Sequence, residues 1–393
     1  MKKFSSLILL IYAIVVPALA QMSIEDILVE IEKNNKTLQA NAQNTEAQKL
    51  AFKSNNPLYN PNVSYDFMYG FPLSAGNQTD FLVNQAFDFP TSYGKRKQLS
   101  EGRVSQSDFQ FNAGRQEILF EAQRTCIEMV YRNKLKSRLE ERKAFTESLL
   151  ANFEKRLNTG EGNILDVNKA RLQLIEINKD YMLNLSQVNQ LTQKLTGLNG
   201  GIEISFNSTS YPQMDSIADF EELFIEIQAK DPTLKFIEMD IASAQKQLEL
   251  SKALALPKLE AGYRSQAILG QRFNGFHMGT TIPLWENKYK VRQSQAELST
   301  SGLKVIQYQN DKYATSRQLF EKYGKLSMTL NEYKTVLSAL DSKDYLDKAL
   351  AVGHISTIEY FLESNYYYMA YNNYLQTEFE YYATIAEILK FRL

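Results

Sequence analysis

The side chains best suited to catalysis and metal binding are scarce in this sequence of 393 residues. It contains two histidines, His277 and His354, and one cysteine, Cys126. His/Cys metal clusters and catalytic triads draw on these residue types, and a single cysteine can form no disulfide within the chain. We also find no Ser/His/Asp set, phosphate-binding loop or glycine-rich cofactor turn. The sequence therefore predicts no enzyme, metal site or cofactor, and Cys126 is expected to be a buried helix residue.

Two glycine turns interrupt segments that otherwise have the composition of continuous helices. They are LNTGEGNILDV, which contains Gly160, and LAVGHISTIEY, which contains Gly353. Glycine readily adopts the left-handed conformation that ends a helix, and Asn163 and Ser356 are suitable N-caps for helices that begin again. Both turns therefore predict a long helix that doubles back on itself.

An acidic residue follows each turn, Asp166 in the first and Glu359 in the second. Both fall in the first turn of the returning helix, where the positive end of the helix dipole stabilises a carboxylate. Helix capping alone is therefore a sufficient explanation for both acids.

The two turns belong to a longer internal duplication. Pro61 matches Pro257 at an offset of 196 residues, and Pro90 matches Pro283 at an offset of 193, which also relates the two glycine turns. A duplicated unit of about 190 residues is too long for a solenoid repeat. The sequence therefore predicts two copies of one large unit.

Each copy is predicted to contain a helical segment, a strand pair bounded by prolines, a very long helix, the glycine turn and a final helix. The predicted helices are 23–56, 95–157 and 163–197, and again 216–254, 288–351 and 356–391. The predicted divisions are an export signal at 1–20, a first copy at 21–200, a linker at 201–215 and a second copy at 216–393. Strands are predicted near 61–90 in the first copy and near 257–283 in the second. The linker is predicted to contain a short strand at Ile202 to Phe206.

Residues 1–20 have the composition of an export signal. Lys2 and Lys3 precede the apolar run SLILLIYAIVV, and Ala18-Leu19-Ala20 is a small-residue cleavage site. A short membrane anchor is the alternative. No later segment reaches 18 consecutive apolar residues, so no transmembrane helix is expected.

The final helix of the first copy has coiled-coil periodicity. Two series recur every seven residues: Val167, Leu174, Tyr181, Val188 and Leu195, and three positions later Ala170, Ile177, Asn184, Leu191 and Leu198. A second apolar edge contains Leu165, Leu172, Ile175 and Met182, which favours contacts with helices on both sides. An ordinary helical bundle is the alternative, but the longest predicted helices would be roughly 90 Å long, far beyond a compact domain.

The segments between the prolines alternate between apolar and polar residues. One face of the first segment carries Val63, Tyr65, Phe67, Tyr69 and Phe71, and runs at 81–89, 259–267 and 276–282 alternate similarly. Strands of about ten residues with one apolar face are typical of a membrane β-barrel, with lipid outside and water inside. The alternative is a soluble β-sandwich. Four strands cannot close a barrel, which needs about eight, so several chains would have to pool their strands.

In their order and duplication, these features resemble the TolC-like outer-membrane efflux channel family over essentially all of the mature chain. NPNVSYDF and LPKLEAGY are similar to the entries into the two hairpins, FDFPTSYGKRKQ and IPLWENKYKVRQ to the passages into the long helices, and the two glycine turns to the helix tips. The resemblance implies an α+β, mostly helical fold. A homotrimer would share a transmembrane β-barrel, with four strands from each chain, and continue it as an α-barrel of coiled-coil helices.

The resemblance also implies a function. The chain would be a passive duct in the cell outer membrane that extends into the periplasm, contacts outer-membrane lipid, and receives substrate from an inner-membrane pump through a periplasmic adaptor. No nucleic-acid partner is expected, because Lys+Arg (44) nearly balances Asp+Glu (45). The alternatives are the exit duct of a type I protein secretion system and a periplasmic coiled-coil adaptor or scaffold. An adaptor would have one helical hairpin flanked by soluble β domains rather than two complete copies.

Finally, the resemblance implies roles for individual residues. An acidic pore aperture that filters cations would contain Glu359, Glu363 and Asp166. The periplasmic tips that dock on the adaptor would contain Gly160, Glu161, Gly162, Asn163, Gly353, His354, Ile355 and Ser356. The lipid-facing strand would carry Val63, Tyr65, Phe67, Tyr69 and Phe71. Leu362 stands where the family has a second acid, and Ile355 where some members have a basic residue, so the closed-state salt bridges of those members are in doubt in this chain.

Overall fold

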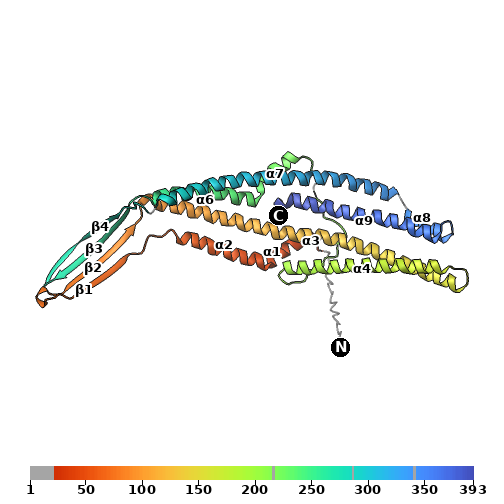
Figure 1. Ribbon diagram of the computed structural model, residues 1–393, viewed down its shortest axis with the longest axis horizontal. Coiled ribbons are helices and arrows are strands. Elements are labelled where there is room, and N and C mark those ends of the chain that lie inside the picture. Colours follow the sequence, from red (N-terminus) through yellow and green to blue (C-terminus); the bar gives the residue numbers. More distant parts are fainter. Residues whose placement is uncertain (1–21, 215–216, 286, 340–341) are drawn as a thin grey trace, which may run out of the picture.

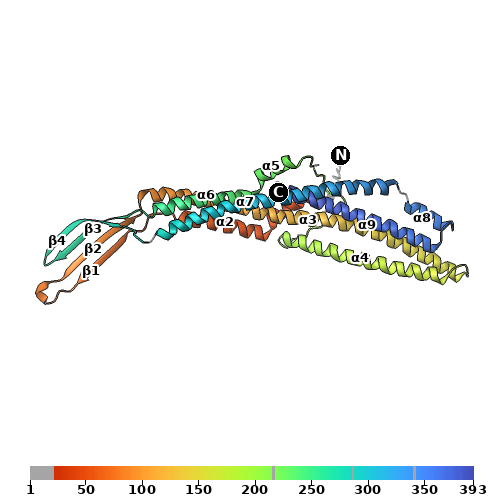
Figure 2. The same cartoon turned by 45° about the horizontal axis from the view of Figure 1, so that its top comes forward.

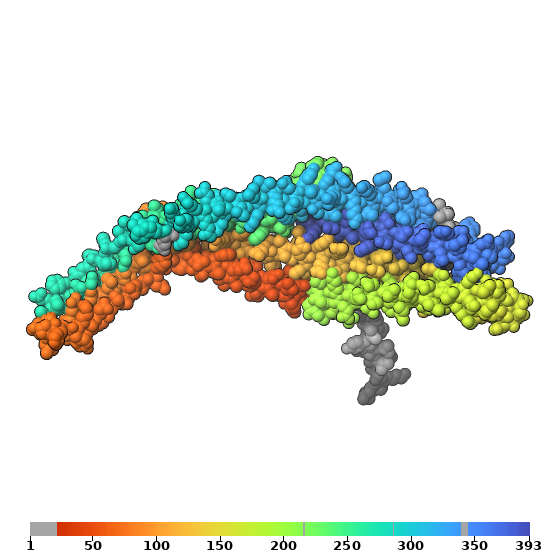
Figure 3. Space-filling model, in the orientation of Figure 1, coloured from red at the N-terminus to blue at the C-terminus, as the bar shows by residue number. Residues whose placement is uncertain are grey.

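The computed structural model describes residues 22–393 except for residues 215–216, 286 and 340–341. The predicted export signal at 1–20 lies outside these residues. The molecule is a long, curved rod with a β-sheet at one end and two helix tips at the other (Figures 1 and 2). Figure 3 shows that the curved body is continuous from the sheet to the tips.

The first half of the chain contains a helical segment, a strand pair, a very long helix and a returning helix, in the predicted order. The long helix has 69 residues and is about 100 Å long at 1.5 Å per residue. The elements are α1 (Ile24–Asn34), α2 (Lys36–Ser54), β1 (Asn62–Met68), a 3-10 turn (Leu73–Ala75), β2 (Gln78–Phe87), α3 (Pro90–Asn158) and α4 (Ile164–Leu198).

The second half contains the same kinds of element in the same order. They are α5 (Phe220–Lys230), α6 (Pro232–Ala253), β3 (Lys258–Ile268), β4 (Gln271–Thr281), α7 (Lys288–Ala339), α8 (Ser342–Ala351), α9 (Thr357–Ile388) and a final 3-10 turn (Leu389–Arg392). The long helix predicted at 288–351 is thus described as two helices, α7 and α8, on either side of residues 340–341.

The first helical segment of each half is two helices rather than the predicted one. Asn35 ends α1 and caps α2, and Asp231, which is 196 residues later, ends α5 and caps α6. Their side chains accept hydrogen bonds from the amides of Leu38 and Thr233, each at 2.9 Å. The sequence prediction missed these breaks because the flanking residues favour helix, although Asn and Asp are preferred N-caps. The equivalent positions of the two breaks support the internal duplication.

The four strands form one antiparallel sheet in the order β1-β2-β3-β4. Pairing of β2 with β3 joins the two halves of the chain and places Val83 opposite Tyr263. Within the described residues, β1 pairs only with β2 and β4 only with β3. Both lateral edges of the sheet are therefore open in a single chain.

The helices form a curved layer rather than a compact bundle (Figures 1 and 2). On the sheet side, α3 lies between α2 and α6, and α6 packs against α7. Toward the tips, α3 lies between α4 and α9, and α9 packs against α7. The lateral edges of the tip half are thus α4 and α7. In the described part of the chain, no helix combines the length and apolar composition needed to cross a membrane.

The heptad pattern predicted for α4 is confirmed on one face. Val167, Ala170 and Ile177 are buried, and Asn184, the predicted polar interruption, is buried and donates a hydrogen bond to the Arg132 carbonyl at 2.9 Å. The second apolar edge is exposed in the single chain. Its members, Leu165, Leu172, Ile175 and Met182, are 59% to 65% exposed.

The largest hydrophobic core lies where α1, α3, α4 and α9 meet. The short strand predicted at Ile202 to Phe206 is wrong: within the described chain this segment pairs with no strand and inserts Ile204 and Phe206 into the core. The apolar residues of this segment alternate because single side chains are buried in the core, and not because the segment belongs to a sheet. Cys126 is fully buried in the same core, as predicted, and burial raises the pKa of its thiol to about 12.

Candidate functional site at the two ends of the rod

The register of the sheet brings the predicted apolar residues of all four strands onto one face. Val63 lies opposite Val83, Val83 opposite Tyr263, and Tyr263 opposite Phe276. The outer residues of this row, Val63 and Phe276, are 61% and 90% exposed. In Figures 1 and 2 the sheet stands clear of the described helices, so nothing in this part of the chain covers its apolar face.

The opposite face of the sheet is polar and internally hydrogen-bonded. Asp80 is 6% exposed and accepts hydrogen bonds from Arg264 at 3.0 Å and from Gln266 at 2.9 Å. His277 Nε2 lies 3.6 Å from Glu260 Oε1 on the neighbouring strand. A sheet with one apolar and one polar, paired face has the chemistry of a wall between lipid and water.

Two of the predicted strand residues lie beyond the strand. β1 ends at Met68, so Tyr69 and Phe71 belong to the connecting loop, where they are 83% and 96% exposed. The prediction of a strand through Phe71 is wrong because the aromatic alternation continues into the loop.

The hairpin between β3 and β4 has a two-residue turn formed by Leu269 and Gly270. Their φ angles are 51° and 78°, and a tight turn between right-twisted strands requires such positive values.

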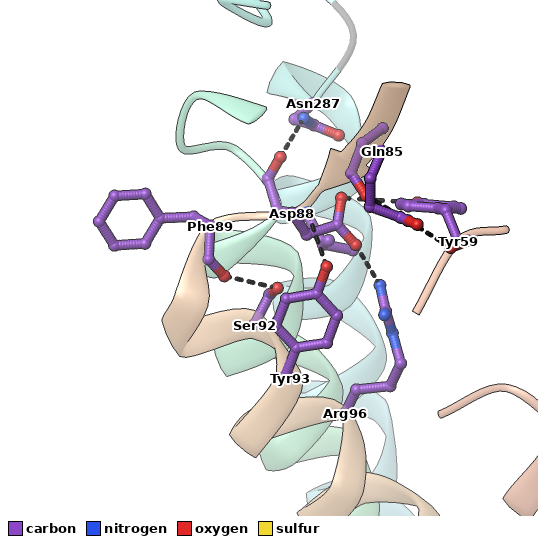
Figure 4. Close-up of polar contacts among 10 residues, drawn as sticks. Tyr59, Gln85, Asp88, Phe89, Ser92, Tyr93, Arg96 and Asn287 are labelled. Atoms are coloured by element: carbon purple, nitrogen blue, oxygen red, sulfur yellow. Dashed lines mark hydrogen bonds and ion pairs between the residues drawn. The ribbon is translucent and has the colours of Figure 1, made fainter. Parts of the chain in front are cut away.

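A buried polar joint ties the end of β2 to the start of α3 (Figure 4). Asp88 is 1% exposed and forms an ion pair with Arg96 at 2.5 Å, and its amide donates to the Tyr93 hydroxyl at 2.9 Å. Ser92 Oγ donates to the Phe89 carbonyl at 2.7 Å. These bonds set the direction in which the sheet leaves the helices. Sequence reasoning did not find the joint, although FDFPTSYGKR places an acid just before a proline-led helix and a basic residue two turns later.

The first tip connects α3 to α4. Gly160 has a φ of 78°, and its amide donates to the Leu157 carbonyl at 3.1 Å. The Glu161 amide donates to the Arg156 carbonyl at 2.9 Å, which completes a Schellman motif. Gly162 lies so close to the helix end that an added Cβ would be 2.5 Å from the Leu157 nitrogen.

The second tip connects α8 to α9 through the same motif. Gly353 has a φ of 75°, and its amide donates to the Leu350 carbonyl at 3.1 Å. The His354 amide donates to the Ala349 carbonyl at 2.8 Å. Ile355 occupies the position of the second glycine of the first tip, so this turn leaves room for a side chain.

Both predicted N-caps are confirmed. Asn163 accepts a hydrogen bond from the Leu165 amide at 3.0 Å. Ser356 accepts one from the Glu359 amide at 3.2 Å, and the Glu359 carboxylate accepts one from the Ser356 amide at 2.8 Å, which together form a capping box. The hydrogen bonds from the backbone and side chain of Ser356 lower the pKa of Glu359. Asp166 lies in the first turn of α4, and its carboxylate forms no hydrogen bond within the described chain.

The predicted site residues thus gather at the two ends of the rod. The two tips lie together at the end opposite the sheet (Figure 1). Glu363 lies one helical turn after Glu359 on α9 and lines a cavity shared with α7 and α8. A single chain holds one copy of each of these acids, so an acidic ring requires several chains.

The same rod is found in several solved structures of membrane channels. CusC matches with 14% identity and a TM-score of 0.77, over 94% of this chain and 91% of CusC. The outer-membrane channel OprN matches with 13% identity and a TM-score of 0.76, over 94% and 89%. The Campylobacter jejuni CmeC outer membrane channel matches with 12% identity and a TM-score of 0.71, over 94% and 85%. The chain has the TolC-like fold.

The TolC-like fold confirms the resemblance inferred from the sequence and the mostly helical α+β class. No protein-family model and no curated protein matches the sequence. The TolC-like fold is therefore shared at a level of identity where few individual side chains are kept. The hydrogen bonds described above for the sheet, the joint and the tips are therefore properties of this chain and are not transferred from its structural neighbours.

Proposed function

We propose that the chain is the outer-membrane channel of a tripartite efflux system. It would form a homotrimeric duct that crosses the outer membrane and extends through the periplasm toward an adaptor and an inner-membrane pump. OprN and CmeC, which share its fold, are outer-membrane channels. The observation that carries the proposal is the sheet: it has one uncovered apolar face, one paired polar face and two open edges.

The open edges of the sheet favour a trimer. In lipid, an unpaired strand edge leaves backbone N–H and C=O groups without hydrogen-bond partners, at a cost of several kcal/mol for each group. Pairing β1 of one chain with β4 of the next would remove these edges. Three chains with four strands each would give twelve strands, above the practical minimum of about eight.

The lateral edges of the helical layer agree with this closure. α4 lies at one edge and exposes the stripe that contains Leu165, Leu172 and Met182. α7 lies at the other edge of the tip half and exposes Met328, which is 68% exposed. Contact between α4 of one chain and α7 of the next would bury these side chains and close the helices into a tunnel.

The tips would form the narrow periplasmic end of the tunnel and the docking surface for the adaptor. In a trimer, Asp166, Glu359 and Glu363 would each occur three times near the axis, and such carboxylates would favour cations at the aperture. The turns around Gly160 and Gly353 would contact the helical hairpins of the adaptor. The duct would let substrate pass and would catalyse no reaction, so it would require no cofactor.

The trimer can be tested with a cysteine pair at the open sheet edges. Because Cys126 is fully buried, a thiol reagent would react with cysteines introduced at the surface rather than with Cys126. Tyr65→Cys on β1 and Phe276→Cys on β4, treated with a bifunctional maleimide in isolated outer membranes, should yield covalent dimers and trimers. Each single variant serves as the control and should yield far less. A chain recovered as a monomer from the soluble periplasm would contradict the proposal.

The aperture can be tested with Glu359→Gln. Glutamine can also complete a capping box, so this variant removes the charge while keeping the helix cap. We expect reduced cation selectivity of the single-channel current in planar bilayers, with Glu176→Gln, on the exposed mid-region of α4, as the matched control. Unchanged selectivity would mean that Glu359 acts only as a cap.

The partners can be identified by a photoreactive residue at position 161 in the first tip. Capture of a periplasmic adaptor that belongs to a small-molecule pump supports efflux. Capture of the adaptor of a protein exporter would instead assign the duct to type I protein secretion. If the captured tip-binding protein were itself an outer-membrane channel, the chain would be the adaptor or scaffold.

A further inference from the structure

A cavity of about 880 Å³ lies between α7, α8 and α9, close to the second tip. Each helix presents one face to it, because the lining residues are spaced three or four apart. The residues that matter for the argument are Glu332, Tyr333 and Val336 from α7, Tyr345 from α8, and Glu363 and Tyr366 from α9. The volume falls within the range of pockets that bind drug-sized molecules.

The lining of this cavity is aromatic and acidic. Four tyrosines contribute aromatic rings: Tyr333, Tyr345, Tyr366 and Tyr367. Glu332 and Glu363 contribute the two charged groups of the described lining. Among the described residues, no lysine, arginine or histidine lines the cavity, and neither carboxylate has an ion-pair partner. The described part of the lining therefore combines π surfaces with negative charge and contributes no cation.

The neighbouring side of α9, which faces α3, already shows how its tyrosines bind cations. The Arg142 guanidinium lies 4.4 Å from the ring centroid of Tyr368, and that of Arg138 lies 4.6 Å from the ring centroid of Tyr371. On that side, α3 supplies the cations. On the cavity side, the described lining pairs tyrosines with carboxylates instead, so a cationic ligand would complement it.

We propose that this cavity binds a hydrophobic organic cation, such as a quaternary ammonium or phosphonium ion. The tyrosine rings would attract the cation through their negative faces, and the carboxylates would add Coulomb attraction. Val336 and the aliphatic remainder of the lining would contact the apolar substituents of the ligand. An anion of the same size and shape would be repelled by both carboxylates and by the ring faces.

The test uses tetraphenylphosphonium and tetraphenylborate, which have nearly the same shape and opposite charge. Binding of each is measured by equilibrium dialysis against the purified mature protein in an uncharged detergent, with protein-free micelles subtracted. We expect saturable binding of the cation and at least tenfold weaker binding of the anion. The double variant Glu332→Gln/Glu363→Gln should weaken cation binding about tenfold. Tyr366→Leu should weaken it about threefold.

Matched variants outside the cavity separate this site from general adsorption. Glu161→Gln removes a carboxylate from the first tip, and Tyr289→Leu removes an exposed tyrosine near the sheet, so neither should change binding. All the substituted side chains are partly or fully exposed, and the oligomeric mass and thermal midpoint check that each variant folds. Equal binding of the two probes, or unchanged cation binding in the double Gln variant, overturns the proposal. Because the measurement needs neither pump nor transport, its failure would leave the proposed duct function standing.

Discussion

The two helix tips end their first helix in the same way and begin their second helix differently. Gly160 and Gly353 have φ of 78° and 75°, and each leads the same pair of Schellman hydrogen bonds. The first tip then needs a second glycine, Gly162, where the second tip has Ile355. The comparison teaches that the duplicated unit keeps the geometry of the helix end, while the path back into the next helix has diverged.

The largest expected effect is that of Gly162→Ala. Its Cβ would lie 2.5 Å from Leu157 N and 2.8 Å from Arg156 C, and these backbone atoms cannot rotate away. We expect the free energy of local opening of the first tip to fall by about 3 kcal/mol. Hydrogen exchange of the tip peptides, followed by mass spectrometry, measures this opening. Ile355→Ala is the control, and an equally large effect there would erase the difference between the tips.

A medium effect is expected from Gly160→Ala and Gly353→Ala. Both positions have positive φ but open space around the added Cβ, so the cost comes from the left-handed backbone alone. Each substitution should lower the opening free energy of its own tip by about 1.5 kcal/mol. Similar values at the two tips, measured by the same exchange experiment, would confirm a shared helix end. A threefold difference between the two free energies would show that the ends are not equivalent.

The shared part of the tips is also the part that the sequence could predict. The roles of the turn and cap residues could be predicted because helix ends depend on local backbone geometry. These residues are Gly160, Gly353, Asn163 and Ser356. The alternation that begins at Val63 and the heptads of α4 are likewise local patterns, and both led to the correct element. Local periodicity and duplication were thus sufficient for the order of the elements, and the resemblance of that order to a known family supplied the TolC-like fold.

The remaining features depend on contacts between distant residues or between elements. The register that places Val83 opposite Tyr263 joins strands from different halves of the chain. The Asp88–Arg96 joint needs a strand and a helix at a particular angle, and the cavity around Glu363 needs three helices at once. The wrong strand at Ile202 to Phe206 has the same origin, because burial in a core can imitate the alternation of a sheet.

A smaller effect is expected from loss of the N-caps, and it should be unequal. Ser356 takes part in two reciprocal hydrogen bonds with Glu359, whereas Asn163 accepts one from Leu165. Ser356→Ala should cost about 1 kcal/mol and Asn163→Ala about 0.5 kcal/mol of helix stability at the respective tips. Hydrogen exchange in the first turns of α9 and α4 measures both. A larger loss at Asn163 would reverse the inferred difference in capping.

The smallest effect is a pH dependence confined to the second tip. Hydrogen bonds from the Ser356 backbone and side chain lower the pKa of Glu359 below its ordinary value of 4.5. Since the folded-state pKa is the lower one, the carboxylate stabilises the tip above pH 4.5, and this contribution is lost as the pH falls through the folded-state pKa. Protection factors in the first turn of α9, corrected for intrinsic exchange, should therefore decrease on acidification. Glu359→Gln keeps a capping partner without a titrating group, so its protection should stay level over the same range. If the decrease persists in Glu359→Gln, another group is responsible, and the capping box is not what distinguishes the second tip in acid.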